Sequence, residues 1–178
     1  PQVTGVQTCA LPIFKLLATS FKKDEKVYAI TAPFLIDATH PLYNVNDVLN
    51  GIYIHGNVIG DVMFFGAGAG KLPTASAVVA DVVDCVKHKG RNVMTLWSYE
   101  KLELGSAMEV ERTFFVRIKD RAALEKAKEA FHAVQTVTVD GLDDEFGLVT
   151  ANMTEQAFAQ AAAQFDVAGR IRFDKTTI

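Results

Sequence analysis

The sequence lacks the features that mark several classes of protein. Its two cysteines, Cys9 and Cys85, have neither metal-site spacing nor the pattern of a disulfide framework, so a reducing cytoplasm is the expected location. Lys and Arg form no basic stripe, and a net charge of -3 argues against nucleic acid or an anionic membrane as partner. No apolar run reaches the roughly 18 residues that cross a bilayer. The four histidines lack ligand spacing, so no metal site is expected.

What the sequence does contain is enough apolar residues for a core. Of its 178 residues, 49% are hydrophobic, which suits one medium domain or two small ones. The composition changes near residue 109, where a mostly polar stretch ends. We therefore place a domain boundary there, with one domain at residues 14–109 and a second at residues 110–178.

The first residues do not look like the start of a domain. They lack the cationic and apolar segments of a signal peptide. The run VTGVQTCALPI, from Val3 to Ile13, resembles the translation of a common sequencing-adapter oligonucleotide. We therefore expect residues 1–13 to be a non-native leader, and the native sequence to be cut near Phe14.

Alternating and β-branched residues predict two hairpins in the first domain. Residues 14–21 and 27–36 form one, with Pro33 marking the end or an edge of its second strand. Residues 51–54 and 58–65 form the other, joined at the tight-turn pair Gly56-Asn57.

A glycine-rich loop and a helix follow the second hairpin. The loop reads Gly66-Ala67-Gly68-Ala69-Gly70, and Pro73-Thr74 opens a helix over residues 74–87. The helix carries a wide face of valine and alanine, which predicts packing against a sheet. Loops of this kind let a backbone approach a neighbour or ligand that a Cβ atom would block.

The second domain shows the order β-α-β-β-α-β. Strands are predicted at residues 113–118, 134–139, 146–151 and 171–173, and helices at residues 121–131 and 154–165, with Thr154 as an N-cap. This order is that of a ferredoxin-like sandwich. The predicted class is therefore α+β, a partial mixed sheet with a packed helix followed by a ferredoxin-like domain.

The residues leave the role of the glycine loop open. A phosphate-binding P-loop needs a glycine where Phe65 stands and a Ser or Thr where Leu72 stands, so that interpretation fails. A dinucleotide fingerprint G-x-G-x-x-G is broken by Lys71. Tight helix–sheet packing with no ligand remains an alternative to a ligand-contacting loop.

Several motifs together resemble the C-terminal region of homoserine dehydrogenases. The run FFGAGAGKLPTASAVVADVVD is similar to the family's GPGAG-x-LPTA-x-AVV-x-D block, with Ala67 in place of the proline. His40-Pro41-Leu42, Val45 and Asn50-Gly51-Ile52 match the family's HPL-x-x-V-x-x-x-x-N-x-I segment. A trailing ACT-type regulatory domain is also common in that family.

The resemblance implies an oxidoreductase that interconverts L-homoserine and L-aspartate 4-semialdehyde with NAD(P), in threonine and methionine biosynthesis. It implies that Gly70 contacts the cofactor and that Gly66 and Gly68 shape the same loop. The family's nucleotide-binding domain and its catalytic lysine, in a D-x-x-G-x-D-x-x-x-K stretch, have no counterpart here, so no catalytic residue is assigned and the fragment is expected to be inactive. A homodimer and a small-molecule substrate are the expected partners.

Two features keep alternative interpretations. His40 precedes a proline in a loop and is either structural or an acid–base group. In ACT domains an amino-acid effector binds where the first strand meets the first helix, which here is the junction at residues 119–124. Asp120 and Leu124 fit the family's D-x-P-G-x-L loop, but its Pro-Gly pair is missing. The domain is therefore an effector-binding module or a dimerisation module, and a non-catalytic amino-acid sensor is the alternative function.

Overall fold

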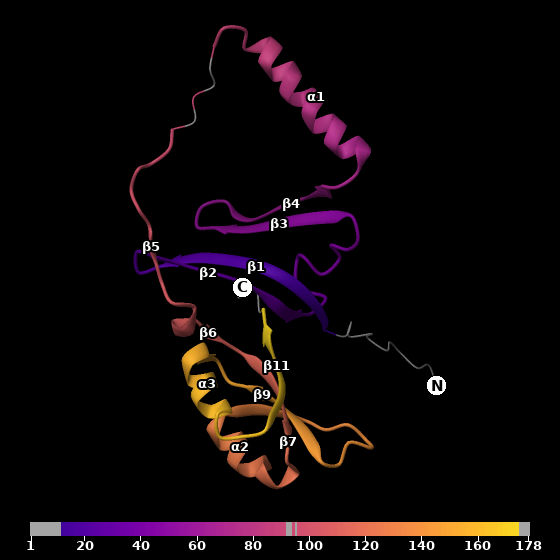
Figure 1. Ribbon diagram of the computed structural model, residues 1–178, viewed down its shortest axis with the longest axis vertical. Coiled ribbons are helices and arrows are strands. Elements are labelled where there is room, and N and C mark those ends of the chain that lie inside the picture. The colour runs from indigo at the N-terminus through magenta and orange to yellow at the C-terminus, as the bar shows by residue number, and fades with distance from the viewer. Residues whose placement is uncertain (1–11, 92–93, 95, 175–178) are drawn as a thin grey trace, which may run out of the picture. The chain divides into compact units, whose positions relative to one another are not determined.

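The computed structural model describes residues 12–91, 94 and 96–174, in two compact units whose elements are labelled in Figure 1. One unit is Ala38–Glu100, and the other joins Pro1–Asp37 to Lys101–Ile178. Strands and helices occur in both units, which confirms the α+β class. No helix in the described ranges is long and apolar enough to span a membrane.

The discontinuous unit begins with a long hairpin, as predicted. Its strands are β1 (Ile13–Lys23) and β2 (Lys26–Ile36), and its two-residue loop is Asp24-Glu25, with φ of 50° and 65°. Two successive positive φ values match the twist of paired strands. β2 continues past Pro33, because its second neighbour pairs with it only from Phe34 onward.

The C-terminal segment folds in the predicted β-α-β-β-α-β order. Its elements are β7 (Phe114–Lys119), η2 (Arg121–Ala123), α2 (Leu124–Ala130), β8 (Ala133–Val137), β9 (Glu145–Thr150), α3 (Glu155–Ala162) and β11 (Val167–Phe173). Shorter elements are β5 (Glu103–Leu104), η1 (Ala107–Glu109), β6 (Glu111–Arg112) and β10 (Met153–Thr154), the last two paired with each other. Thr154 is the predicted N-cap of α3, and its hydroxyl accepts from Ala157 N at 3.0 Å.

The two parts of this unit share one sheet, in the order β1-β2-β11-β7-β9-β8. β11 pairs with β2 in parallel at Arg172–Phe34 and Phe173–Leu35, and β5 pairs with β2 as well. The compact units therefore differ from the domain division at residue 109, because strand pairing attaches the β1–β2 hairpin to the C-terminal segment.

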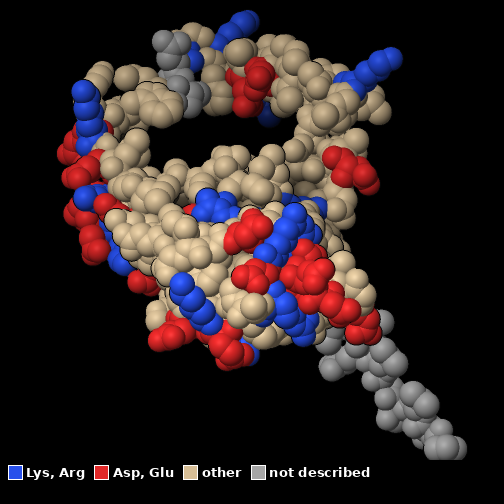
Figure 2. Space-filling view, turned by 60° about the horizontal axis from the view of Figure 1, so that its bottom comes forward, with Lys and Arg blue, Asp and Glu red and all other residues tan. Residues whose placement is uncertain are grey.

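One face of this sheet packs on α2 and α3 around a cluster of aromatic side chains. Phe114, Phe131 and Phe158 are fully buried, and the rings of Phe114 and Phe158 stack with centroids 4.3 Å apart. Ala127 of α2 and Phe131 at its C-cap are both buried in this cluster. In the lower part of the view in Figure 2, acidic and basic side chains are interspersed.

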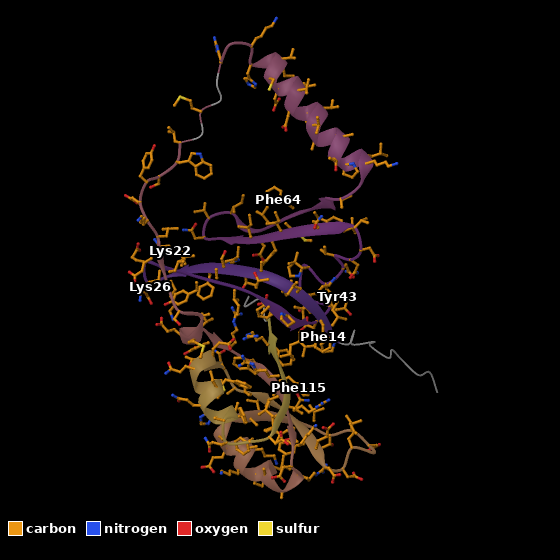
Figure 3. The ribbon with its side chains drawn as sticks, in the orientation of Figure 1. Phe14, Lys22, Lys26, Tyr43, Phe64 and Phe115 are labelled. Carbon is orange, nitrogen blue, oxygen red and sulfur yellow. The ribbon has the colours of Figure 1, made fainter. Side chains whose placement is uncertain are left out.

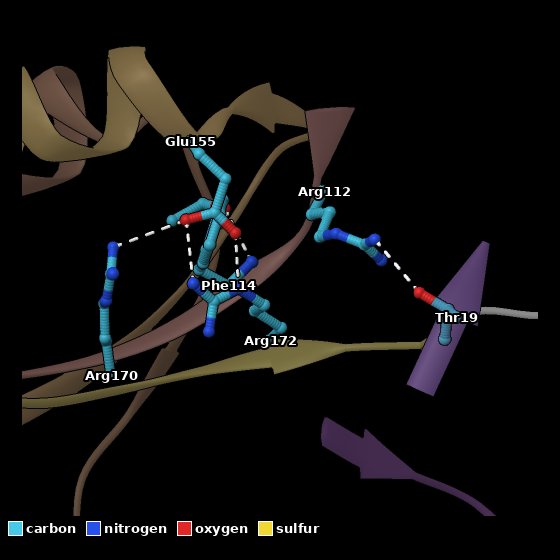
Figure 4. A network of polar contacts seen from close by, with 7 residues as sticks. Thr19, Arg112, Phe114, Glu155, Arg170 and Arg172 are labelled. Carbon is cyan, nitrogen blue, oxygen red and sulfur yellow. Dashed lines mark hydrogen bonds and ion pairs between the residues drawn. The ribbon is translucent and has the colours of Figure 1, made fainter. Parts of the chain in front are cut away.

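A buried ion pair fastens α3 to β11 (Figure 4). Glu155, only 3% exposed, accepts from Nε and Nη2 of Arg172, and Arg170 Nη1 lies 3.5 Å from its Oε2. Nearby, Arg112 lies over the Phe34 ring and donates to Thr19, while its Nε has no partner among the described residues. Burial lowers the pKa of Arg112 from its usual value.

The unit Ala38–Glu100 contains a second hairpin and a helix. The strands are β3 (Leu49–Gly56) and β4 (Gly60–Ala67), and the helix is α1 (Lys71–Lys87). The loop between the strands is residues 57–59 rather than the predicted pair Gly56-Asn57. β4 begins at Gly60, which adopts a positive φ of 73° that a glycine takes without strain.

The valine face of α1 is exposed, although the sequence predicts that it packs against a sheet. No residue of α1 is buried, and Val78, Val82 and Val86 are 57%, 57% and 65% exposed. Cys85, on the same helix, is also exposed. No described segment covers this face. Exposed apolar patches of this kind mark interaction surfaces.

Substituting Glu155 tests the ion pair. Glu155→Gln removes the buried charge that Arg172 and Arg170 share, and leaves the largely buried guanidinium of Arg172 without this counterion. We expect a loss of about 3 kcal/mol in the free energy of unfolding, measured by urea denaturation. The control Glu125→Gln removes an exposed pair with Lys128 and should change that free energy by less than about 0.5 kcal/mol. Equal effects of the two variants would contradict a structural role for Glu155.

Candidate functional site

The predicted glycine loop lies between β4 and α1, as the sequence indicates. Gly66 and Ala67 are the last residues of β4, and the loop proper is residues 68–70. The helix begins at Lys71, three residues before the predicted start. Pro73 therefore lies in its first turn, where the missing N–H costs no helical hydrogen bond.

Gly70 is glycine because of its backbone conformation. It occupies the N-cap position of α1 with φ of 122° and ψ of 162°, a region that is essentially restricted to glycine. Its carbonyl accepts the first helical bond, from Thr74 N at 3.2 Å. This residue sets the direction in which the chain leaves β4 and enters the helix.

Gly68 is glycine because the side chain of Asn50 occupies the space that a Cβ atom would need. A Cβ atom built on Gly68 would lie 2.0 Å from Asn50 Nδ2 and 3.0 Å from Asn50 Cγ. The Asn50 amide therefore covers the bare Cα of Gly68. The sequence places Asn50 in a segment that resembles the family but assigns it no role at the site. Its place there follows from strand register, which pairs Asn50 with Gly66 in the β3–β4 ladder.

Gly66 has no such internal reason. Its φ is not in the left-handed region, and a Cβ atom built on it meets nothing within 4 Å. The space beside Gly66 is thus open, on the same face of the hairpin as the Asn50 side chain. A glycine with free space beside it is what close approach by a ligand requires.

The N-terminus of α1, beside the loop, has no negatively charged or capping side chain of its own. No acidic residue occupies the first turn of α1, and no side chain caps it. The first N–H groups of a helix have no acceptor within it and favour negative charge. Lys71 is exposed at this end. The loop therefore suits an anionic group such as a phosphate.

His40 lies in a turn and is largely buried, at 4% exposed. Its Nδ1 accepts from Leu42 N at 3.1 Å, and its carbonyl accepts from Tyr43 N at 2.9 Å. These bonds fix the turn that leads to β3, which favours the structural interpretation of His40.

A polar cluster lies on the other face of the β3–β4 hairpin. His55 and Asp61 are cross-strand partners, and His55 Nδ1 donates to Asp61 Oδ1 at 2.6 Å. Hydrogen bonds from His55 and then Tyr53 lower the pKa of Asp61, and the bond to Asp61 raises the pKa of Tyr53. The cluster is exposed, and it links β3 to β4 next to the loop that joins them.

The C-terminal segment has a hollow at the predicted effector junction. Its volume is about 830 Å³, and it is lined from residues 118–123 and by Lys126, Asp144, Gln164, Phe165 and Asp166. Groups of both charge signs line it. The Asp120 carboxylate accepts from Ala122 N at 3.0 Å, so this backbone N–H is already engaged.

Among the described residues, no cluster of three or more His, Cys, Asp or Glu side chains has the arrangement of a metal site. The predicted glycines Gly66, Gly68 and Gly70 lie close to Asn50, where the end of β4 leads into α1 beside β3. The predicted effector junction lies in the other unit.

Comparison with known proteins identifies relatives of the segment that carries the loop. A homoserine dehydrogenase family model matches residues 12–83. The homoserine dehydrogenase of Lactococcus lactis subsp. lactis is 40% identical over 77 residues, 43% of this chain and 18% of that protein. That of Mycobacterium bovis is 27% identical over 165 residues, 83% of this chain and 37% of that protein.

A solved structure has a similar fold. The structure of a homoserine dehydrogenase from Thiobacillus denitrificans superposes with a TM-score of 0.74 at 23% identity, over 92% of this chain and 43% of that chain. The chain therefore spans less than half the length of each of these relatives.

The two glycines at the ends of the loop should respond differently to alanine. Gly70→Ala forces an alanine into a glycine-only conformation and should destabilise β4 and α1 by about 1–3 kcal/mol. Gly66→Ala meets no atom and should leave stability unchanged or raise it by up to about 1 kcal/mol. Urea denaturation followed through the amide resonances of β4 and α1 measures both. A larger loss for Gly66→Ala than for Gly70→Ala would refute this account of the loop.

Proposed function

We propose that this chain, whose residues 12–83 match the homoserine dehydrogenase family model, is a C-terminal part of such an enzyme. The complete enzyme interconverts L-homoserine and L-aspartate 4-semialdehyde with NAD(P) in threonine and methionine biosynthesis, in the cytoplasm. The observation that carries the proposal is the matched segment itself, because it contains the loop and the open space beside Gly66.

The domain organisation follows the sequence motifs. Residues 14–109 form the C-terminal part of the substrate-binding and dimerisation domain, and residues 110–178 form an ACT-like domain. The family match begins at residue 12 and β1 begins at Ile13, so both include Ile13, a residue of the predicted leader. The exposed valine face of α1 supports this organisation, since the rest of the enzyme, as a homodimer, offers the surface to cover it.

The loop residues have distinct tasks toward the cofactor. Gly66 leaves room for close approach, Gly68 accommodates the Asn50 amide, and Gly70 turns the chain from β4 into α1. The bound NAD(P) supplies the nicotinamide that exchanges hydride with the aldehyde carbon. The uncapped helix N-terminus favours an anionic phosphate.

The chain alone should not catalyse the reaction, because its sequence has no D-x-x-G-x-D-x-x-x-K stretch to supply the proton-transferring lysine. It should bind the cofactor only weakly, because the family's nucleotide-binding domain has no counterpart in this sequence. In a titration of the ¹⁵N-labelled chain with NADP⁺, the amide signals of residues 66–71 should move while those of α2 and α3 stay fixed. No semialdehyde-dependent oxidation of NADPH is expected. Unmoved loop signals would refute the cofactor assignment, and measurable oxidation would refute the inactivity of the fragment.

The hollow at the β7–η2 junction favours a second candidate function, that of an amino-acid-sensing module. Its mixed charges, from Asp120, Lys126 and Asp166 among others, suit the ammonium and carboxylate groups of an amino acid. Calorimetric titration with threonine separates the alternatives. Heat of binding that disappears in Lys126→Ala supports sensing, and absence of binding supports a dimerisation role for this segment.

A further inference from the structure

The open face of the β3–β4 hairpin carries one polar side chain in an otherwise apolar surface. The residues that share this face are paired as Asn50–Gly66, Ile52–Phe64 and Ile54–Val62. Ile52 and Phe64 are 62% and 61% exposed, and the Phe64 side chain is labelled in Figure 3. Among the paired residues of this face, Asn50 alone is able to form side-chain hydrogen bonds.

The opposite face of the hairpin is packed at Gly51, although Phe65 and Met63 on that face are 56% and 37% exposed. A Cβ atom on Gly51 would lie 2.8 Å from Leu42 Cδ2 and 2.9 Å from Val45 Cγ2, so the segment before β3 packs against that face. Tyr53, His55 and Asp61 are engaged with one another there. A ligand that approaches the glycines through open space therefore approaches on the side of Asn50.

Asn50 is exposed, and its position is constrained. Its amide lies across Gly68, where a Cβ atom would come within 2.0 Å of Nδ2, and it stands opposite the empty space at Gly66. No hydrogen bond to another described residue holds this amide. Its donor and acceptor groups are thus available beside Gly66 and Gly68, where the backbone carries no side chains.

From this arrangement we propose that Asn50 is a cofactor-contacting residue whose amide pairs with the carboxamide of the nicotinamide ring. An amide presents a donor and an acceptor side by side, and another primary amide complements both. The exposed side chains of Ile52 and Phe64 provide apolar surface for a planar ring next to that contact. The assignment rests on the proposed cofactor role of the glycine loop and adds the group that it recognises.

The test uses the two halves of the cofactor as separate probes on the ¹⁵N-labelled 178-residue chain. Nicotinamide mononucleotide should move the side-chain NH₂ signals of Asn50 and the amides of Gly66 and Gly68. Adenosine 2′,5′-bisphosphate should leave the Asn50 side-chain signals in place. The loss of one neutral hydrogen-bonding group typically weakens binding about fivefold, so Asn50→Ala should raise the dissociation constant for the mononucleotide by about that factor.

Two further variants separate contact from packing. Asn50→Asp keeps the shape that lies on Gly68 but removes both N–H donors, and should weaken mononucleotide binding as Asn50→Ala does. Asn57→Ala changes an asparagine in the loop at the far end of the same hairpin and should have no effect. In each variant, unchanged nuclear Overhauser contacts between β3 and β4 establish that the hairpin is folded.

The outcomes distinguish this inference from the function on which it rests. If NADP⁺ moves the loop amides of the wild-type chain but Asn50→Ala binds the mononucleotide as tightly as wild type, the Asn50 contact is refuted and the cofactor loop stands. Wild-type affinity in Asn50→Asp alone refutes the amide–amide pairing, because the donor role is then absent and only an acceptor oxygen or packing on Gly68 is left. If NADP⁺ moves no loop amide of the wild-type chain, both assignments are refuted.

Discussion

The register of the β3–β4 ladder is the constraint on which the candidate site depends. Pairing Asn50 with Gly66 puts the asparagine amide, the empty space at Gly66 and the bare Cα of Gly68 on one face of the hairpin. A slip of one residue would turn Asn50 toward Phe65 or Ala67 and move every side chain of the strand to the other face. Gly51 opposes such a slip, because Leu42 and Val45 leave no room for a side chain at its position.

In the other unit, the fold depends on the pairing of one strand, β11. It is the strand through which the β-α-β-β-α-β segment and the β1–β2 hairpin become one sheet. The side chains of Arg170 and Arg172 on this strand share the buried carboxylate of Glu155, so the start of α3 is fixed to the same strand. A sheet shared in this way makes the stability of the hairpin depend on the C-terminal segment, although the two are far apart in the sequence.

Local patterns in the sequence predicted much of this fold. Alternation of apolar residues predicted both hairpins, and Thr154 marked a helix start. The glycine loop was predicted at the junction of a strand and a helix, where Gly68 and Gly70 lie, although Gly66 is still part of the strand. The pairing of β2 with β11 was not predictable, since parallel pairing of distant segments leaves no local pattern. The exposure of the α1 valines was not predictable either, because apolar periodicity shows which face is buried in the complete assembly and not what covers it. Asn50 was noted in a motif but given no role, because its place at the site depends on its cross-strand position opposite Gly66.

The central claim is that Gly66 is glycine for the sake of a ligand, whereas Gly68 and Gly70 are also required by the fold. The affinity of NADP⁺ for the wild-type chain and for Gly66→Ala, measured by titration of the loop amides at equal protein stability, tests this most directly. The account predicts that the alanine methyl group, filling the open space beside residue 66, weakens binding at least about tenfold, equivalent to about 1.4 kcal/mol. Equal affinities for the two proteins would contradict it.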